Sequence, residues 1–283
     1  MFCNKSEIQL KLLRTLPLHA ASGLVKLGDA FYVVADDKLS LFTFSLDDIS
    51  KQDKLVLFAG HLPKDHLERK KVKPDLECLA YTPEGLLAVP SGSKPNRQMG
   101  SFINFRSEVR NLDFSQIYKS LNTEFSELNI EGAAFVDSKL ILLQRGNGIL
   151  AQNALIEIDG KDILEDTVIK SERILKINKI NLGKLQNINL GFTDACYADG
   201  ILFFLAVAED SNSTYDDGQY VGACIGYINK NAEAILLNKL DCPLKPEGLW
   251  VEKINLGYKC YIVTDADCTE QLSGLYMGEF FTT

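Results

Sequence analysis

The chain has 283 residues, of which 46% are hydrophobic and 24% charged, a composition typical of a globular domain. Its formal net charge of −8 at pH 7 argues against a nucleic acid as partner. No apolar run reaches about 18 residues, and the N-terminal stretch MFCNKSEIQLKLLRTLPLHA lacks the apolar centre of a secretion signal. We therefore expect a cytoplasmic protein with no membrane partner.

Cysteine usage and one basic segment carry little specific chemistry. The seven cysteines are odd in number, and none has the CxxC spacing of zinc and redox motifs. Several fall inside apolar runs, which indicates buried reduced thiols. The basic cluster KDHLERKKVKPD at 64–75 is interpreted as a solvated loop.

Five short motifs recur along the chain, and each puts an oxygen-bearing side chain at the head of an apolar run. In chain order they are ASGLVKL, DLECLAY, NIEGAAF, GFTDACY and KPEGLWV, with the head residues Ser22, Glu77, Glu131, Thr193 and Glu247. Successive heads are separated by 55, 54, 62 and 54 residues. A period of this size corresponds to four short strands, which is one blade of a β-propeller.

Each head is followed by further runs of β-branched, aromatic and leucine residues between Gly, Asp, Asn and Pro. The second runs are AFYVVADD, GLLAVPSGS, KLILLQRGN, ILFFLAVAED and CYIVTDAD. Third runs include LSLFTFSL and NALIEIDG, and fourth runs include KLVLFAG, RILKINKI and AILLNKL. The remaining fourth run, LDFSQIY, also fits a helical turn. Short strands with this punctuation are typical of all-β proteins.

The fifth repeat lacks a fourth run because the chain ends at Thr283, whereas the N-terminus has a spare one in EIQLKLLRTLP. We expect this segment to pair with SGLYMGEF, which would close the ring without a free edge. The prediction is therefore an all-β, five-bladed β-propeller formed by residues 1–283 as a single domain, with repeats beginning near the five heads. A six-bladed ring is the alternative.

The heads begin the innermost strands, so their side chains should converge at one mouth of the central channel. Glutamates brought to within ~5 Å repel by ~3 kcal/mol per pair at an effective dielectric near 20. Oxygen ligands without His or Cys suit a hard cation, so Ser22, Glu77, Glu131, Thr193 and Glu247 are predicted to hold calcium, with magnesium as the alternative. The other interpretation is that each Glu caps backbone amides and no ion is bound.

Polar residues at the ends of the second runs should rim the same mouth. Arg145 is predicted to bind an anionic group, and Glu209 and Asp265 to position water, as catalytic residues. Further ligand-binding candidates are Asp36, Lys94, Gln144, Asn147, Asp210, Tyr215 and Asp267. For each acid the alternative is a turn or capping role.

Two resemblances add to this interpretation. The segments LPLHAASGL, LGFTDA and AEDSNSTYDDG, together with LLQRGNG, resemble a family of uncharacterised bacterial proteins, a domain of unknown function. The five heads are also similar to those of the soluble calcium-activated nucleotidases (apyrases), which implies five blades and one calcium ion held by inner-strand side chains. On that pattern Thr193 stands where the nucleotidases have a second serine, and their nucleotide-binding residues have no counterpart here.

These observations predict a monomer that binds a small anionic or polar ligand at the channel mouth. The predicted activity is metal-dependent hydrolysis of phosphate esters or anhydrides, or of esters or lactones. The alternative is a propeller without enzymatic activity, whose ion is structural and whose rim binds a ligand or a protein.

Overall fold

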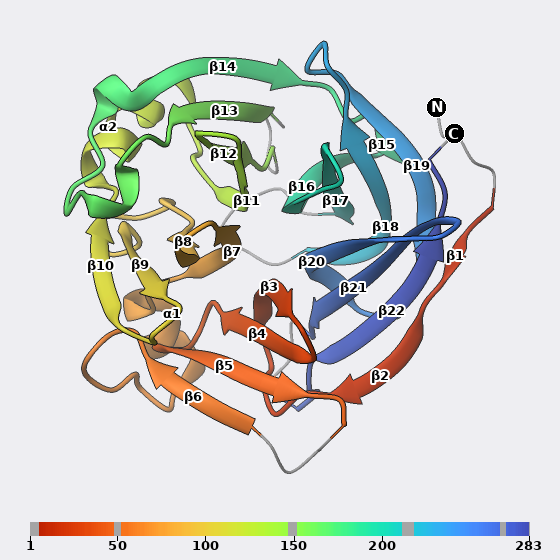
Figure 1. Ribbon diagram of the computed structural model, residues 1–283, viewed down its shortest axis with the longest axis horizontal. Helices are drawn as coiled ribbons and strands as arrows, with labels where there is room; N and C mark the ends of the chain where they lie inside the picture. The colour runs from red at the N-terminus through yellow and green to blue at the C-terminus, as the bar shows by residue number, and fades with distance from the viewer. Residues whose placement is uncertain (1–5, 48–51, 147–151, 211–217, 267–269, 283) are drawn as a thin grey trace.

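Five antiparallel sheets stand around a central axis in the computed structural model, which describes residues 6–47, 52–146, 152–210, 218–266 and 270–282 (Figure 1). In each sheet, called a blade here, the strand that carries the head residue is innermost. The chain runs through the blades in sequence order. The predicted five-bladed propeller is confirmed, and the six-bladed alternative is wrong.

The first three blades each have four strands in sequence order. Blade 1 consists of β3 (Ala21–Leu27), β4 (Ala30–Ala35), β5 (Ser40–Ser45) and β6 (Gln52–Val56). Blade 2 consists of β7 (Leu76–Thr82), β8 (Gly85–Pro90), β9 (Met99–Asn104) and β10 (Val109–Asp113). Blade 3 consists of β11 (Ile130–Val136), β12 (Lys139–Gln144), β13 (Asn153–Asp159) and β14 (Ile174–Ile180).

The last two blades are completed by the N-terminal segment. Blade 4 consists of β16 (Ile188–Ala198), β17 (Ile201–Asp210), β18 (Gln219–Ile228) and β19 (Ala234–Asp241), flanked by β15 (Lys184–Leu185) and β1 (Ile8–Gln9). Blade 5 consists of β20 (Lys245–Ile254), β21 (Gly257–Asp265), β22 (Gly274–Phe280) and β2 (Lys11–Thr15).

Ring closure uses the segment that the sequence predicts. Strand β2 pairs antiparallel with β22, with Leu12 opposite Tyr276. Strand β1 adds a contact that the sequence did not predict, because it pairs in parallel with the outer strand β19, where Ile8 lies opposite Leu240. The N-terminal segment therefore joins blades 4 and 5 and covers the outer edges of both.

Helices are short and lie outside the blades. They are α1 (His66–Val72), α2 (Ser115–Glu124) and the 3-10 turns η1 (Ile163–Glu165) and η2 (Ser171–Arg173). The predicted solvated loop at 64–75 is thus wrong for its middle part, where Asp65 caps α1 by accepting from Glu68 N. None of the described helices has the length and apolar character needed to span a membrane.

Apolar side chains pack between blades rather than at one centre. The described residues form five buried clusters, one at each boundary between neighbouring blades. The cysteines that are described, Cys78, Cys196, Cys224, Cys242 and Cys260, are all buried and unbridged, as predicted. Each blade is therefore held by the apolar faces of its two neighbours.

Every inner strand has a β-bulge at its head residue. The register shifts fall between Ala21 and Gly23, Leu76 and Cys78, Ile130 and Gly132, Phe192 and Asp194, and Pro246 and Gly248. A bulge leaves its extra residue outside the regular pairing and re-aims the side chain. The same local irregularity thus turns all five head residues out of their sheets at one end of the axis, called the head end here.

The residue after the head is glycine in three blades because the neighbouring inner strand approaches closely. A Cβ on Gly23 would lie 2.5 Å from Leu79 N, and one on Gly132 would lie 3.1 Å from Ala195 N. In blade 4 the equivalent residue is Asp194, whose Oδ2 instead accepts a hydrogen bond of 2.7 Å from Leu249 N. Neighbouring inner strands are thus joined directly, which fixes the spacing of the heads.

A methyl group at these contacts tests this packing. We expect Gly23→Ala to lower the free energy of unfolding by about 1–3 kcal/mol, since backbone atoms of blade 2 occupy the space that the Cβ needs. Gly132→Ala should lower the free energy of unfolding by less, because the atoms nearest to its Cβ are farther away. Equal or negligible losses in urea unfolding of the two variants would contradict the close approach of blades 1 and 2.

Candidate functional site

Two of the five head residues use their hydroxyl groups to join neighbouring blades. Ser22 Oγ donates to the carbonyl oxygen of Leu76 at 2.5 Å, and Thr193 Oγ1 donates to that of Pro246 at 2.9 Å. Each acceptor directly precedes the glutamate head of the next blade. The hydroxyls therefore position Glu77 and Glu247 through the backbone.

Arg145 is the centre of the charge balance at the head end. It follows β12 and is only 3% exposed. Its Nη1 lies 3.4 Å from Glu131 Oε1 and 3.9 Å from Glu247 Oε1, while its Nη2 pairs with Glu209 Oε2. Burial alone would lower the pKa of Arg145, but these carboxylates raise it. The predicted anion-binding side chain is thus enclosed by three anions, because the bulged heads converge on the end of β12.

The two glutamate heads beside Arg145 have further polar neighbours. Asn129 Nδ2 donates to Glu131 Oε1 at 2.6 Å, and Lys245 Nζ lies 3.2 Å from Glu247 Oε1. Burial raises the pKa of both carboxyl groups, and well above the ordinary value for Glu247. The nearby cations Arg145 and Lys245 act against that rise.

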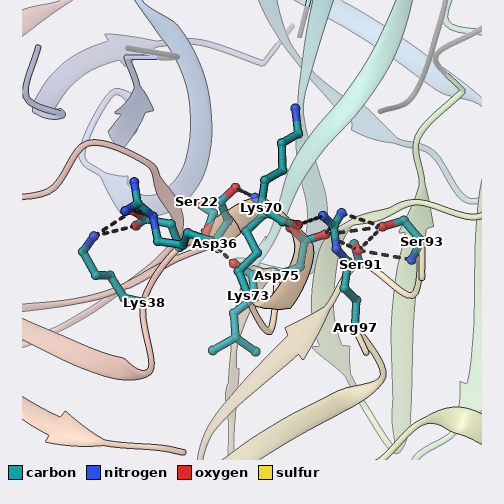
Figure 2. A network of polar contacts seen from close by, with 12 residues as sticks. Ser22, Asp36, Lys38, Lys70, Lys73, Asp75, Ser91, Ser93 and Arg97 are labelled. Atoms are coloured by element: carbon teal, nitrogen blue, oxygen red, sulfur yellow. Dashed lines mark hydrogen bonds and ion pairs between the residues drawn. The ribbon is translucent and has the colours of Figure 1, made fainter. Parts of the chain in front are cut away.

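A second charged cluster lies between blades 1 and 2 (Figure 2). The backbone places its acids side by side, because Asp75 N donates to the carbonyl oxygen of Asp36 at 3.2 Å. Lys73 Nζ pairs with Asp36 Oδ2 and lies 2.8 Å from Asp75 Oδ1, and Arg97 Nη1 donates to Asp75 Oδ2 at 2.8 Å. Ser91 Oγ donates to the same oxygen at 2.5 Å.

The two acids of this cluster differ in charge environment. Burial raises the pKa of Asp36, and the attraction of Lys73 only partly opposes it. Burial also acts to raise the pKa of Asp75, but Lys73 and Arg97 together hold it below its usual range. Asp75 has a φ of 60°, a left-handed conformation that is uncommon outside glycine and that clusters at functional sites.

Glu77 lies next to the acids of the second cluster and also interacts electrostatically with Glu131 of the first. It is half-buried and makes no hydrogen bond or ion pair with the part of the chain that the structure describes. Burial raises its pKa well above the ordinary value, and the charges of Asp75, Glu131 and Asp36 add to the rise. One carboxylate oxygen from each of Asp36, Asp75 and Glu77 lies within 4.8 Å of the others.

The remaining predicted rim residues differ in burial and in their contacts. Glu209 Oε1 accepts from Gly218 N at 2.8 Å, and Asp265 is half-buried near Glu247, whose pKa it raises. Gln144 is 2% exposed and its amide bonds to Asn129 N, to Glu127 O and to Arg145 O. Lys94 is half-buried and Asp210 is exposed at the end of β17. The candidates Asn147, Tyr215 and Asp267 lie outside the described residues.

Sequence reasoning missed Lys73, Asp75 and Lys245, although a signal for them exists. Asp75 and Lys245 each stand two residues before a glutamate head, and Lys73 two residues earlier still. These residues lead directly into β7 or begin β20, so their short separation from the heads in sequence places them beside the heads. Lys73 was missed because the segment 64–75 was interpreted as a solvated loop.

Comparison with known proteins identifies the family. Residues 17–279 match the model of a family of unknown function (DUF6929), so the chain belongs to that family. No curated protein sequence matches the chain.

Solved structures of other proteins are similar to the whole propeller, including the following two. One is a glutaminyl cyclase from Myxococcus xanthus, with 12% identity, a TM-score of 0.53 and coverage of 98% of this chain and 100% of that chain. The other, from Parabacteroides distasonis, is assigned as a glycoside hydrolase, with 13% identity, a TM-score of 0.53 and coverage of 93% and 87%. At such identities the likeness shows the fold alone.

Removal of Arg145 tests the charge balance. Arg145 opposes the raised pKa of Glu131 and Glu247, so Arg145→Met should raise both further. A raised carboxyl pKa gives stability that is present below the unfolded value and lost as pH rises through the folded value. We therefore expect a loss of about 3–5 kcal/mol at pH 8 and a smaller loss at pH 5, measured by urea unfolding.

The matched control for this variant is Arg173→Met. Arg173 pairs with Asp166 at 2.6 Å, but this pair is partly exposed, so its loss should be small at both pH values. A loss for Arg145→Met that does not change between pH 5 and pH 8 would contradict a charge-balancing role.

Proposed function

We propose that the head end binds one divalent cation through Asp36, Asp75 and Glu77 and hydrolyses a small anionic ester or anhydride there. The observation that carries the proposal is the approach of three carboxylate oxygens to within 4.8 Å of one another. These residues come from blades 1 and 2, so the proposed ligand set differs from the five-membered ring expected from sequence. Only Glu77 belongs to both sets.

The chemistry of the donors fits a hard cation. All three ligands are carboxylates, which suit calcium and magnesium. Asp36 Oδ1 is buried and has no hydrogen-bond partner among the described residues, so it is oriented by the fold and still available. Glu77 is likewise unpaired within that part of the chain, and a cation would favour its charged form.

Lys73 competes with a cation for the same oxygens. Its ammonium group pairs with Asp36 and Asp75, so cation binding displaces it from at least one of them. A displaced Lys73 would stand beside the bound ion with a free positive charge, in position to pair with an anionic substrate. Arg97 stays with Asp75 and Ser93, which it contacts at 2.8 and 2.9 Å.

The division of roles follows from these positions. A bound divalent cation supplies a Lewis acid that polarises a phosphoryl or carbonyl oxygen. Lys73 binds the anionic group of the substrate, and the half-buried Asp265 orients water from blade 5, where it bridges to Ala20 beside Asp36. Arg145 and Lys245 hold Glu131, Glu209 and Glu247 in place through their ion pairs, which supports the site without substrate contact.

A propeller without enzymatic activity is the second candidate, favoured by a specific observation. Lys73, Arg97, Arg145 and Lys245 already compensate most carboxylates of the head end. An ion bound at Glu77 would then complete the charge balance and act structurally. The two candidates differ in whether hydrolysis accompanies cation binding.

Cation binding is tested by thermal unfolding. With calcium or magnesium in large excess over the dissociation constant, the wild-type protein should gain about 3 kcal/mol of stability at a hundredfold excess. Glu77→Gln should abolish this gain, since it removes a charged ligand while keeping the side-chain shape. The exposed rim residue Asp210 provides the control, because Asp210→Asn should keep the full gain. A gain that survives Glu77→Gln would place the ion elsewhere.

Activity is tested with aryl phosphates, nucleoside diphosphates, aryl esters and lactones in the presence of each ion. The expected result is hydrolysis of one class that a chelator and Glu77→Gln both abolish and that Lys73→Met lowers at least tenfold. If the ion stabilises the protein but no substrate is hydrolysed, the ion has a structural role and the proposed enzymatic activity is contradicted.

A further inference from the structure

The axis of the propeller is divided by a layer of apolar side chains. Two residues beyond each head, the inner strands contribute Leu24, Leu79, Ala133, Ala195 and Leu249, all at most 4% exposed. We call these five residues the apolar collar. They lie between the charged head end and the opposite end of the axis, where the inner strands turn into the second strands. This opposite end is called the turn end here.

A cavity of about 230 Å³ lies at the turn end, with the apolar collar as its floor. Aromatic residues line it: Tyr81, Phe135 and Tyr197 stand next to the last residue of their inner strands. Trp250 lies in the middle of β20. Tyr81 stands between two other rings, with centroid distances of 6.3 Å to Trp250 and 6.2 Å to Phe105. Tyr81 and Phe105 are 42% and 57% exposed, so large rings face solvent at this mouth.

Acidic residues surround the aromatic walls. The hairpin turns that end the inner strands of blades 1, 2 and 3 carry the exposed residues Asp29, Glu84 and Asp137, and Asp137 also lines the cavity. Nearby lysines are neutralised by other acids: Lys26 lies 2.7 Å from Glu252, and Lys253 lies 3.2 Å from Asp199. Exposed carboxylates at three of these turns favour a cationic ligand.

We propose that the turn-end cavity binds a small organic cation, an ammonium group on an apolar body with one aromatic ring. Aromatic faces attract a cation through their quadrupole, and the surrounding rings stack on an aromatic ligand. Asp137 accepts a charge-assisted hydrogen bond from the ammonium group at the cavity edge. The cavity is smaller than the sites of drug-sized ligands, which start near roughly 300 Å³, so the ligand has a single ring.

This site is independent of the proposed hydrolysis. The apolar collar separates the two ends, and none of the cavity residues belongs to the head-end clusters. Loss of cation binding at Glu77 therefore leaves the turn-end cavity unchanged.

Trp250 provides a direct signal, since it is the only tryptophan in the chain. We expect phenethylamine to change its fluorescence saturably at pH 7. The anion 3-phenylpropionate, which has the same phenethyl group, should bind at least tenfold more weakly, and the neutral 3-phenylpropanol should fall between them. Equal affinities for the three probes, or no saturable change, would overturn the proposal.

Two variants assign the roles within the cavity. Tyr81→Ala should weaken phenethylamine binding at least tenfold, whereas Phe281→Ala, which removes an exposed ring outside the cavity, should have no effect. Asp137→Asn should weaken the amine and leave phenylpropanol unchanged. Asn tolerates the φ of 53° at this turn, so the variant keeps the fold. An amine affinity unaffected by Asp137→Asn would contradict the charged contact.

Discussion

The structure depends on how buried carboxylates are held together at the head end of the axis. The propeller brings Glu77, Glu131 and Glu247 to one level, where low solvent exposure strengthens their mutual repulsion. Arg145 lies against two of them and Lys245 against one. Lys73 forms ion pairs with the neighbouring residues Asp36 and Asp75. Glu77 has no ion pair among the described residues, and the attraction of Lys73 only partly opposes the rise in its pKa, so the proposed cation site follows from that imbalance.

The same inner strands produce two chemically different ends. At their beginnings the bulges turn oxygen-bearing side chains out of the sheets, and near their ends three of the strands carry aromatic side chains, Tyr81, Phe135 and Tyr197. Between them the apolar collar and the close backbone contacts at Gly23 and Gly132 keep the blades in register. One repeated strand thus sets the position of a charged site, a barrier and an apolar cavity.

The repeat pattern predicted the fold well. Head spacing and strand punctuation depend on local residue types, so the five blades and the closing strand β2 could be found from sequence. Strand β1 could not, because it is only two residues long and it pairs with β19 outside the repeat of four strands per blade. The fourth run of blade 2 was placed too late in sequence, since β10 ends at Asp113 and α2 begins at Ser115.

For the site, sequence placed the heads but not their partners. The convergence of Glu131 with Glu247 follows from equivalent positions in the repeats. The direction of Arg145 and the inward position of Lys73 depend on loop geometry that no repeat encodes. Gln144 illustrates the same limit, because a polar residue at a strand end was predicted to bind a ligand and instead bonds to three backbone groups.

The most direct test is a crystal structure obtained with manganese, whose anomalous scattering locates the ion. The account predicts one peak at the head end within about 2.0–2.6 Å of oxygens from Asp36, Asp75 and Glu77, with the ammonium group of Lys73 moved away from these acids. A structure without such a peak, in which Lys73 still lies between Asp36 and Asp75, would contradict it.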